Sequence, residues 1–163
     1  MVFVKFSACL SWPETAPAAV IPAATFAPEI IERFGACGLV APNELTAFLQ
    51  PLTIEGDFDG DGAHDLAAPV ARATDGKRGL AICRAGTYLD LVGFEGAMGE
   101  VVPAYFDRID KWALHARGPV GQSAEQGPPP ALRGDAIAIG KDDSSSALIY
   151  WTGTGYHSYW QGD

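Results

Sequence analysis

The sequence predicts an α+β domain in which N-terminal helices precede a mainly antiparallel sheet of about five or six strands. Helical spacing of apolar residues is confined to residues 28–50, whereas the rest of the chain holds short apolar runs separated by turn residues. Glycine (19) and proline (12) are frequent among the 163 residues, which favours strands joined by turns over long helices. We therefore expect one α+β domain over residues 28–163.

Two helices are expected first. The segment PEIIERFGACG (28–38) opens with proline and glutamate, carries an apolar stripe at helical spacing and ends at a glycine that can cap it. A second short helix is expected from Asn43, an N-cap for the residues ELTAFLQ, up to Pro51. Residues 1–27, rich in alanine and proline from position 13 onward, are expected to be a leader or linker.

Strands are expected in most of the remaining chain. TDGK (74–77) and TGTG (152–155) are turns between apolar runs, and residues 117–130 form a loop rich in glycine and proline. Several of the connecting turns are short enough for consecutive strands to pair directly. The expected strands cover residues 66–71, 78–84 and 88–92, a segment near Trp112, and residues 135–140, 146–151 and 156–161.

The charge of the chain excludes one class of partner. Twenty acidic residues against eleven Lys and Arg give a formal net charge of −9, and the basic residues are scattered along the chain. A nucleic-acid phosphate backbone requires a basic surface that releases counterions, so we expect no nucleic-acid partner. No apolar run reaches 18 residues, so no membrane span is expected either.

The segment EGDFDGDGAHDLA (55–67) predicts a bound calcium ion. Asp57, Asp59 and Asp61 alternate, Gly62 follows, and Asp65 is the ninth residue counted from Asp57. Calcium takes six to eight oxygen ligands. A tight loop can direct these four carboxylates and the carbonyl of Ala63 at one ion. Without a cation, such close carboxylates would repel one another and raise one another's pKa values.

The same residues carry a resemblance to a known motif. An EF-hand requires a bidentate glutamate at position 12, where this chain has Ala68. The pattern Asp-x-Asp-x-Asp-Gly-x-x-Asp followed by an apolar strand instead resembles the calcium loop of FG-GAP and VCBS-type repeats. The resemblance covers residues 56–70 and implies a calcium loop between two strands. Those repeats build propellers from several copies, and this chain has one copy, so we expect no propeller.

The three cysteines give information about the cellular compartment in which the protein is located. In an exported protein Cys37 and Cys83 could pair and leave Cys9 over, whereas in a reducing compartment all three would be thiols, and the sequence leaves open whether the bridge forms. The segment FSAC before Leu10 resembles a lipoprotein processing site that needs a longer signal upstream. Calcium near millimolar concentration is found outside the cytosol, which favours a periplasmic or secreted location, with a lipid anchor if such a signal precedes this chain.

The C-terminal hairpin offers a second candidate surface. Strand alternation places Tyr156 and Trp160 on one face of the last strand and His157 and Tyr159 on the other. One face should join the core, and the other is either an exposed binding platform or ordinary cross-strand packing. The aromatic residues concerned are Tyr150, Trp151, Tyr156, Tyr159 and Trp160.

These observations favour a binding function over catalysis. The three histidines are far apart in sequence, and no nucleophile-elbow, metalloprotease or P-loop motif is present. We expect a calcium-stabilised exported domain that binds a protein partner or an envelope polymer, as inhibitor or immunity proteins do. Two alternatives stay open, namely a hydrolase of cell-wall or polysaccharide substrates and a carbohydrate-binding module.

Overall fold

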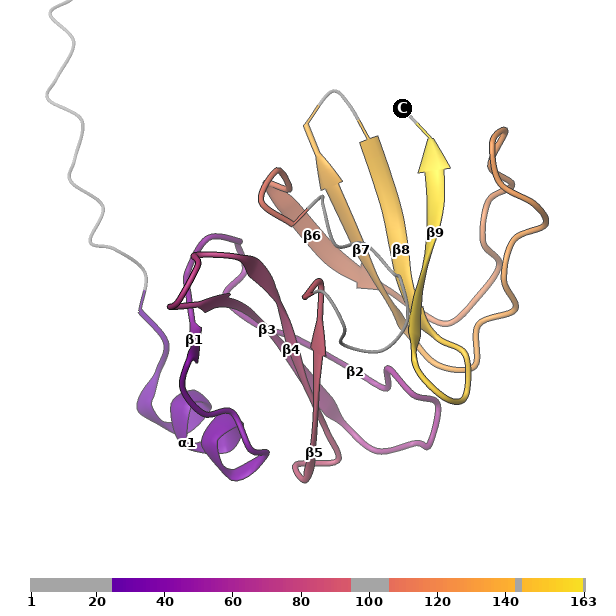
Figure 1. Ribbon diagram of the computed structural model, residues 1–163. Helices are drawn as coiled ribbons and strands as arrows, with labels where there is room; N and C mark the ends of the chain where they lie inside the picture. The colour runs from indigo at the N-terminus through magenta and orange to yellow at the C-terminus, as the bar shows by residue number, and fades with distance from the viewer. Residues whose placement is uncertain (1–24, 95–105, 143–144, 163) are drawn as a thin grey trace, which may run out of the picture.

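A computed structural model describes residues 25–94, 106–142 and 145–162, and within these ranges the fold is mostly β (Figure 1). The one described helix, α1, spans Pro28–Ala36 and is too short to cross a membrane. The nine described strands are β1 Asn43–Leu45, β2 Ile54–Gly56, β3 Asp65–Arg72, β4 Arg78–Arg84, β5 Tyr88–Val92, β6 Lys111–His115, β7 Ala136–Lys141, β8 Ser145–Trp151 and β9 Tyr156–Gly162. The leader or linker expected at residues 1–27, including Cys9, lies outside the described residues except for residues 25–27.

The strands form two antiparallel sheets. The first, sheet A, has the order β1-β3-β4-β5, and β2 also pairs with β3. Because β2 and β4 both pair with Leu66 and Ala67, β2 must lie on the side of β3 opposite β4, which is also the side of β1. The second, sheet B, has the order β6-β7-β8-β9. Consecutive strands are therefore neighbours from β3 to β5 and from β6 to β9.

Sheet A is covered on both faces. Leu80 and Ile82 of β4 pack with residues of sheet B, whereas Ala81 and Cys83 of the same strand pack with Phe34 of α1. This alternation follows from the two-residue period of a strand, and it explains why the central strand β3 is buried from Asp65 to Val70 without interruption. The result is three layers, with α1 outside, sheet A in the middle and sheet B on the far side (Figure 1).

The expected fold class is therefore wrong. The described residues form one short helix and two sheets, where the sequence predicted N-terminal helices followed by a single sheet. Alternating apolar residues identified most of the strands, but alternation does not say which strands pair. The continuous burial of β3 and β4 requires a cover on each face, and one nine-residue helix cannot cover both.

The expected second helix is also wrong. Its first residues, Asn43–Leu45, form β1, which pairs with β3, and Leu49 is buried in the core. A helix between Asn43 and Pro51 would leave about half of its backbone N–H and C=O groups without intrahelical partners. Pairing with β3 satisfies part of this backbone, since the N–H of Thr46 donates to the carbonyl of Pro69 at 3.0 Å.

Pro69 explains why two short strands share one side of β3. Proline has no N–H, so it weakens a sheet wherever a partner would accept that hydrogen bond. The bond from Thr46 shows that the backbone polar groups of Pro69 face the side of β1 and β2. β1 pairs with β3 at Val70 and beyond, and β2 pairs with it up to Ala67. The missing donor therefore falls in the gap between the two strands.

A disulfide joins α1 to sheet A. Cys37, directly after α1, is bonded to Cys83 of β4, and the two Cα atoms are 5.8 Å apart. This is the pairing that the sequence predicted for an exported protein. Phe34, which is fully buried, packs in the same cluster. The bond therefore fixes a short helix that would be only marginally stable by itself.

Removing this bond is expected to destabilise the chain. The bond closes a loop with a sequence separation of 46, for which the chain-entropy model gives about 4 kcal/mol. The double variant Cys37→Ala/Cys83→Ala should lower the free energy of unfolding by a comparable amount in urea denaturation monitored by circular dichroism. Asp142→Asn, which changes an exposed side chain just after β7, is the control and should leave the denaturation midpoint unchanged.

Candidate metal centre

The acidic loop connects β2 to β3 and is shaped by glycines. Gly60 and Gly62 have φ angles of 78° and 87°, a backbone region that favours glycine. A Cβ atom at Gly60 would also lie 2.5 Å from the carbonyl oxygen of Arg133, so this position excludes any side chain. The loop can therefore turn tightly against the segment that precedes β7.

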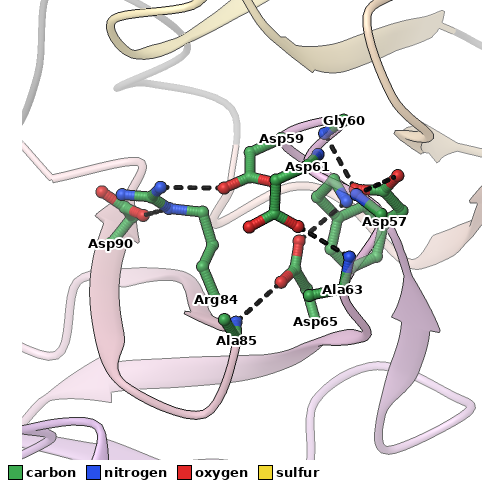
Figure 2. Close-up of polar contacts among 11 residues, drawn as sticks. Asp57, Asp59, Gly60, Asp61, Ala63, Asp65, Arg84, Ala85 and Asp90 are labelled. Carbon is green, nitrogen blue, oxygen red and sulfur yellow. Dashed lines mark hydrogen bonds and ion pairs between the residues drawn. The ribbon is translucent and has the colours of Figure 1, made fainter.

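Three carboxylates converge in this loop, as the sequence predicted (Figure 2). Asp57, Asp59 and Asp61 each offer one oxygen, and these oxygens all lie within 4.8 Å of one another. Backbone N–H groups of the loop orient them: Gly60 and Gly62 donate to Asp57 at 2.8 and 3.1 Å. Asp59 and Asp61 accept from the N–H groups two residues later, at 3.2 and 2.7 Å. A group of this kind could bind a metal ion.

Asp65, the fourth expected carboxylate ligand, has another role in the described structure. Its side chain is fully buried, and its two oxygens accept the N–H groups of Phe58 at 2.8 Å and of Ala85 at 2.9 Å. Burial raises the pKa of this carboxyl group, the two hydrogen bonds oppose that shift, and the charges of Asp59 and Asp61 add to it. Asp65 thus ties the acidic loop to the turn between β4 and β5.

Ala63, whose carbonyl was expected to be a ligand, contacts the triad of Asp57, Asp59 and Asp61 through its N–H group. That group donates to Asp61 at 2.7 Å, which places Ala63 directly beside the converging carboxylates. The expected ligand set is therefore gathered in one loop, but Asp65 lies beneath the triad with both of its oxygens engaged.

Arg84 is a central residue of the site that sequence reasoning missed. Its guanidinium group pairs with Asp59 at 2.9 Å and with Asp90, whose side chain is buried (Figure 2). It also lies over the rings of Trp151 and Tyr88, at 4.6 and 5.6 Å from their centroids. Burial by itself would lower the pKa of Arg84, but hydrogen bonds to Asp90 and Asp59 outweigh it and raise the pKa above its usual range. A protein cation therefore already neutralises part of the acidic cluster.

Asp135, just before β7, holds the loop from the other sheet. One of its oxygens accepts the N–H of Asp57 at 3.0 Å, and the other accepts the N–H of Arg117 at 2.8 Å. Its own N–H donates to the carbonyl of Asp57 at 2.7 Å. The neighbouring Gly134 permits this approach, because a Cβ atom there would lie 2.2 Å from the same carbonyl. The start of the acidic loop is therefore fixed between the two sheets.

The five aromatic residues of the C-terminal hairpin are all at least half-buried. Tyr156 is buried and packs edge-on against Trp151, with ring centroids 5.0 Å apart. Trp151 and Trp160 pack against the core between the sheets, whereas Tyr150 faces His157 across β8 and β9. Most of these contacts are the cross-strand and core packing that the sequence left open as one alternative.

Tyr159 is covered by the glycine- and proline-rich loop at residues 117–130. Its hydroxyl group accepts the N–H of Ser123 at 2.9 Å and donates to the carbonyl of Gly127 at 3.0 Å. The side chain of Gln126 accepts the N–H of Trp160 at 2.8 Å. In Figure 1 this loop runs beside β9, so the loop lies against the last strand of sheet B.

The Tyr156 hydroxyl group is the one buried side-chain polar atom without a hydrogen-bond partner in the described part of the chain. Burial raises its pKa strongly, and the negative charges of Asp90 and Asp65 raise it further. The phenol therefore stays neutral, and it lies close enough to the acidic cluster to respond to its charge.

Comparison with known proteins identifies no relative. No family model matches the chain, and neither the curated proteins nor the solved structures include a significant match. The site must therefore be interpreted from its own geometry.

Asp65→Asn is expected to destabilise the fold. An asparagine side chain has one acceptor oxygen, so its NH₂ group would face one of the two N–H donors that Asp65 accepts. A buried donor without an acceptor costs roughly 1–3 kcal/mol, which should appear as a lower free energy of unfolding in urea denaturation. The control Asp142→Asn changes an exposed side chain just after β7 and should have little effect.

Arg84→Met is expected to cost about 3 kcal/mol in the same measurement, because breaking a buried ion pair leaves an uncompensated charge. Here two buried carboxylates, Asp59 and Asp90, would lose their partner. Lys111→Met removes the cation of an exposed pair with Asp142 and should change stability little. A similar loss in the two variants would contradict a special role for Arg84.

Proposed function

We propose that this chain is an exported, non-enzymatic domain whose acidic loop holds a calcium ion and which acts by binding a protein or an envelope polymer. The observation that carries the calcium site is the convergence of Asp57, Asp59 and Asp61 on one point. A binding role of the kind that inhibitor or immunity proteins have agrees with the acidic character of the chain, which has a net charge of −9.

The donor set supports a hard cation. The converging ligand atoms are carboxylate oxygens without sulfur or imidazole nitrogen among them, and this chemistry suits calcium or magnesium more than zinc or copper. Each oxygen that accepts one N–H hydrogen bond keeps a second lone pair. Calcium tolerates irregular coordination better than magnesium does, and we propose calcium on this ground together with the spacing of the loop carboxylates.

The disulfide supports export. Structural disulfides persist in oxidising compartments such as the periplasm and the extracellular space, and they are rare in the cytosol. Cys37 and Cys83 are buried and bonded to each other. Calcium is also abundant in these compartments, so the loop and the disulfide favour the same location.

Contacts around the loop favour binding over hydrolysis. A hydrolase needs carboxylates that are free to exchange protons or attack a substrate. Asp57, Asp59, Asp61 and Asp65 each accept at least one hydrogen bond from the protein, and Asp90 pairs with Arg84. A carbohydrate-binding platform is favoured less as well, because none of the five hairpin aromatics is fully exposed.

Calcium titration with thermal unfolding tests the metal site. A ligand that binds only the folded state stabilises it by about 1.4 kcal/mol at ten times its Kd. For a site with a Kd of about 0.1 mM, 1 mM calcium chloride should therefore raise Tm by about 3–6 °C over a chelator-treated sample. Asp57→Asn/Asp61→Asn should abolish this increase. Asp142→Asn, which removes an exposed carboxylate just after β7, should retain this increase. Equal Tm values with calcium and with chelator would rule out the site.

Arg84→Met provides a second test. Calcium would neutralise Asp59 when Arg84 is absent, so the calcium-dependent rise in Tm should be larger in this variant than in the original chain. An unchanged rise would place the ion away from Asp59.

An assay of polymer hydrolysis tests the non-enzymatic role. Calcium-dependent release of reducing ends from cell-wall polymer, lost in Asp57→Asn/Asp61→Asn, would contradict a purely binding role.

A further inference from the structure

An apolar groove of about 530 Å³ lies beside α1, away from the acidic loop. Its lining includes Phe26, Ile31, Leu39, Val40 and Leu45. Ile31 is 55% exposed and Val40 is 68% exposed, although both are apolar. Two of the four large apolar side chains that are exposed in the described structure thus belong to one concave surface, which is a common property of binding sites.

One wall of the groove is the outer strand of a sheet. β1 pairs with β3 on one side, and the hydrogen bonds of that ladder fall at alternate residues of β1. The N–H of Thr46 donates to Pro69 of β3, and the carbonyl of Pro42 accepts the N–H of Ala73 directly after β3, so the even-numbered positions face β3. The backbone of Leu45 therefore faces away from β3. Among the residues that the structure describes, no hydrogen bond reaches the N–H or C=O of Leu45 from that side.

The charged residue of the groove lining is acidic. Glu44 is an exposed lining residue, neither Lys nor Arg is among the described lining residues, and Glu29 and Glu32 are exposed on α1. The basic residue of α1, Arg33, donates to the carbonyl of His64 at 3.2 Å, which directs it toward the acidic loop. A ligand that carries positive charge beside apolar groups would complement this surface.

We propose that the groove between α1 and β1 binds an extended, basic segment of a partner protein, which pairs with β1 and places apolar side chains against Ile31, Val40 and Leu45. Strand addition at a sheet edge, with side-chain pockets beside it, is a general mode of peptide recognition. The proposal rests on the binding role proposed above and adds the surface and the chemistry of the partner.

The test uses the full chain and a fluorescein-labelled heptapeptide of alternating lysine and valine, with binding followed by fluorescence anisotropy. The expected result is saturable binding of this peptide. The matched peptide of alternating glutamate and valine should bind at least about tenfold more weakly, since like charges would meet at Glu44. Methylation of all backbone nitrogens of the Lys/Val peptide should abolish binding, because the strand could no longer donate to β1.

Two single variants with the same charge change locate the site. Val40→Lys should weaken binding about tenfold, because it places a cation in the groove and removes apolar contact, equivalent to about 1.4 kcal/mol. Leu114→Lys changes another exposed apolar residue, on β6 of sheet B, and should leave affinity within about twofold. Glu44→Gln should weaken binding of the Lys/Val peptide and not of an uncharged peptide.

Several results would overturn the proposal. These are the absence of saturable binding, equal binding of the Glu/Val peptide, or equal effects of Val40→Lys and Leu114→Lys. If Val40→Lys lowers Tm in the absence of peptide, a segment of the chain itself occupies the groove. If the original chain sediments as a dimer and Val40→Lys sediments as a monomer, the groove binds a second copy of the chain. If the peptide fails to bind while calcium still raises Tm, the metal site stands and only the groove assignment fails.

Discussion

The buried carboxylate of Asp65 is the contact on which the arrangement around β3 depends. It begins the central strand of sheet A and accepts N–H groups from Phe58 in the acidic loop and from Ala85 in the next turn. Phe58 is itself part of the core between the two sheets. Because Asp65 and Asp135 hold the loop by backbone hydrogen bonds, the three converging carboxylates are pre-ordered by the protein. A pre-ordered site loses less conformational entropy when an ion binds.

Arg84 changes how the acidic cluster should be understood. Crowded carboxylates do not by themselves require a metal, since this guanidinium group already compensates Asp59 and Asp90. It also contacts Trp151 of sheet B, so the electrostatics of the loop and the packing of the two sheets share one side chain. A cation at Asp57, Asp59 and Asp61 would act on the same charges. The loop is thus coupled to the sheet interface through a residue outside the motif.

The sequence predicts the positions of single helices and strands better than it predicts which strands pair with one another. The helix at residues 28–38 and the strands that became β3, β4, β5, β7, β8 and β9 were expected at nearly their observed bounds, because apolar periodicity and turn residues are local signals. The segment after Asn43 was misassigned because pairing with β3 overrode its helical pattern. The continuous apolar runs of β3 and β4 already indicate burial on both faces, but the second sheet was missed because a single sequence does not say which strands pair.

In the candidate site as well, contacts within one loop could be predicted from the sequence, and contacts between distant residues could not. Spacing alone placed Asp57, Asp59 and Asp61 together, since all three belong to one tight loop. Arg84 and Asp135 were missed because they join the loop from 25 and 78 residues away, and a single sequence carries no signal of such contacts. The hydrogen bonds that bind both oxygens of Asp65 were equally invisible, as one donor lies in the turn after β4.

The loop at residues 117–130 has a consequence for the behaviour of the chain in solution. Outer strands of β-sheets are templates for uncontrolled association, because their backbone groups can recruit another strand. Gln126 occupies the N–H of Trp160 on β9, and Tyr159 anchors Ser123 and Gly127 beside it. A second copy of this chain could pair with the outer edge of β9 only after these hydrogen bonds to the loop were broken. The loop at residues 117–130 therefore leaves fewer backbone groups of β9 open to a further strand.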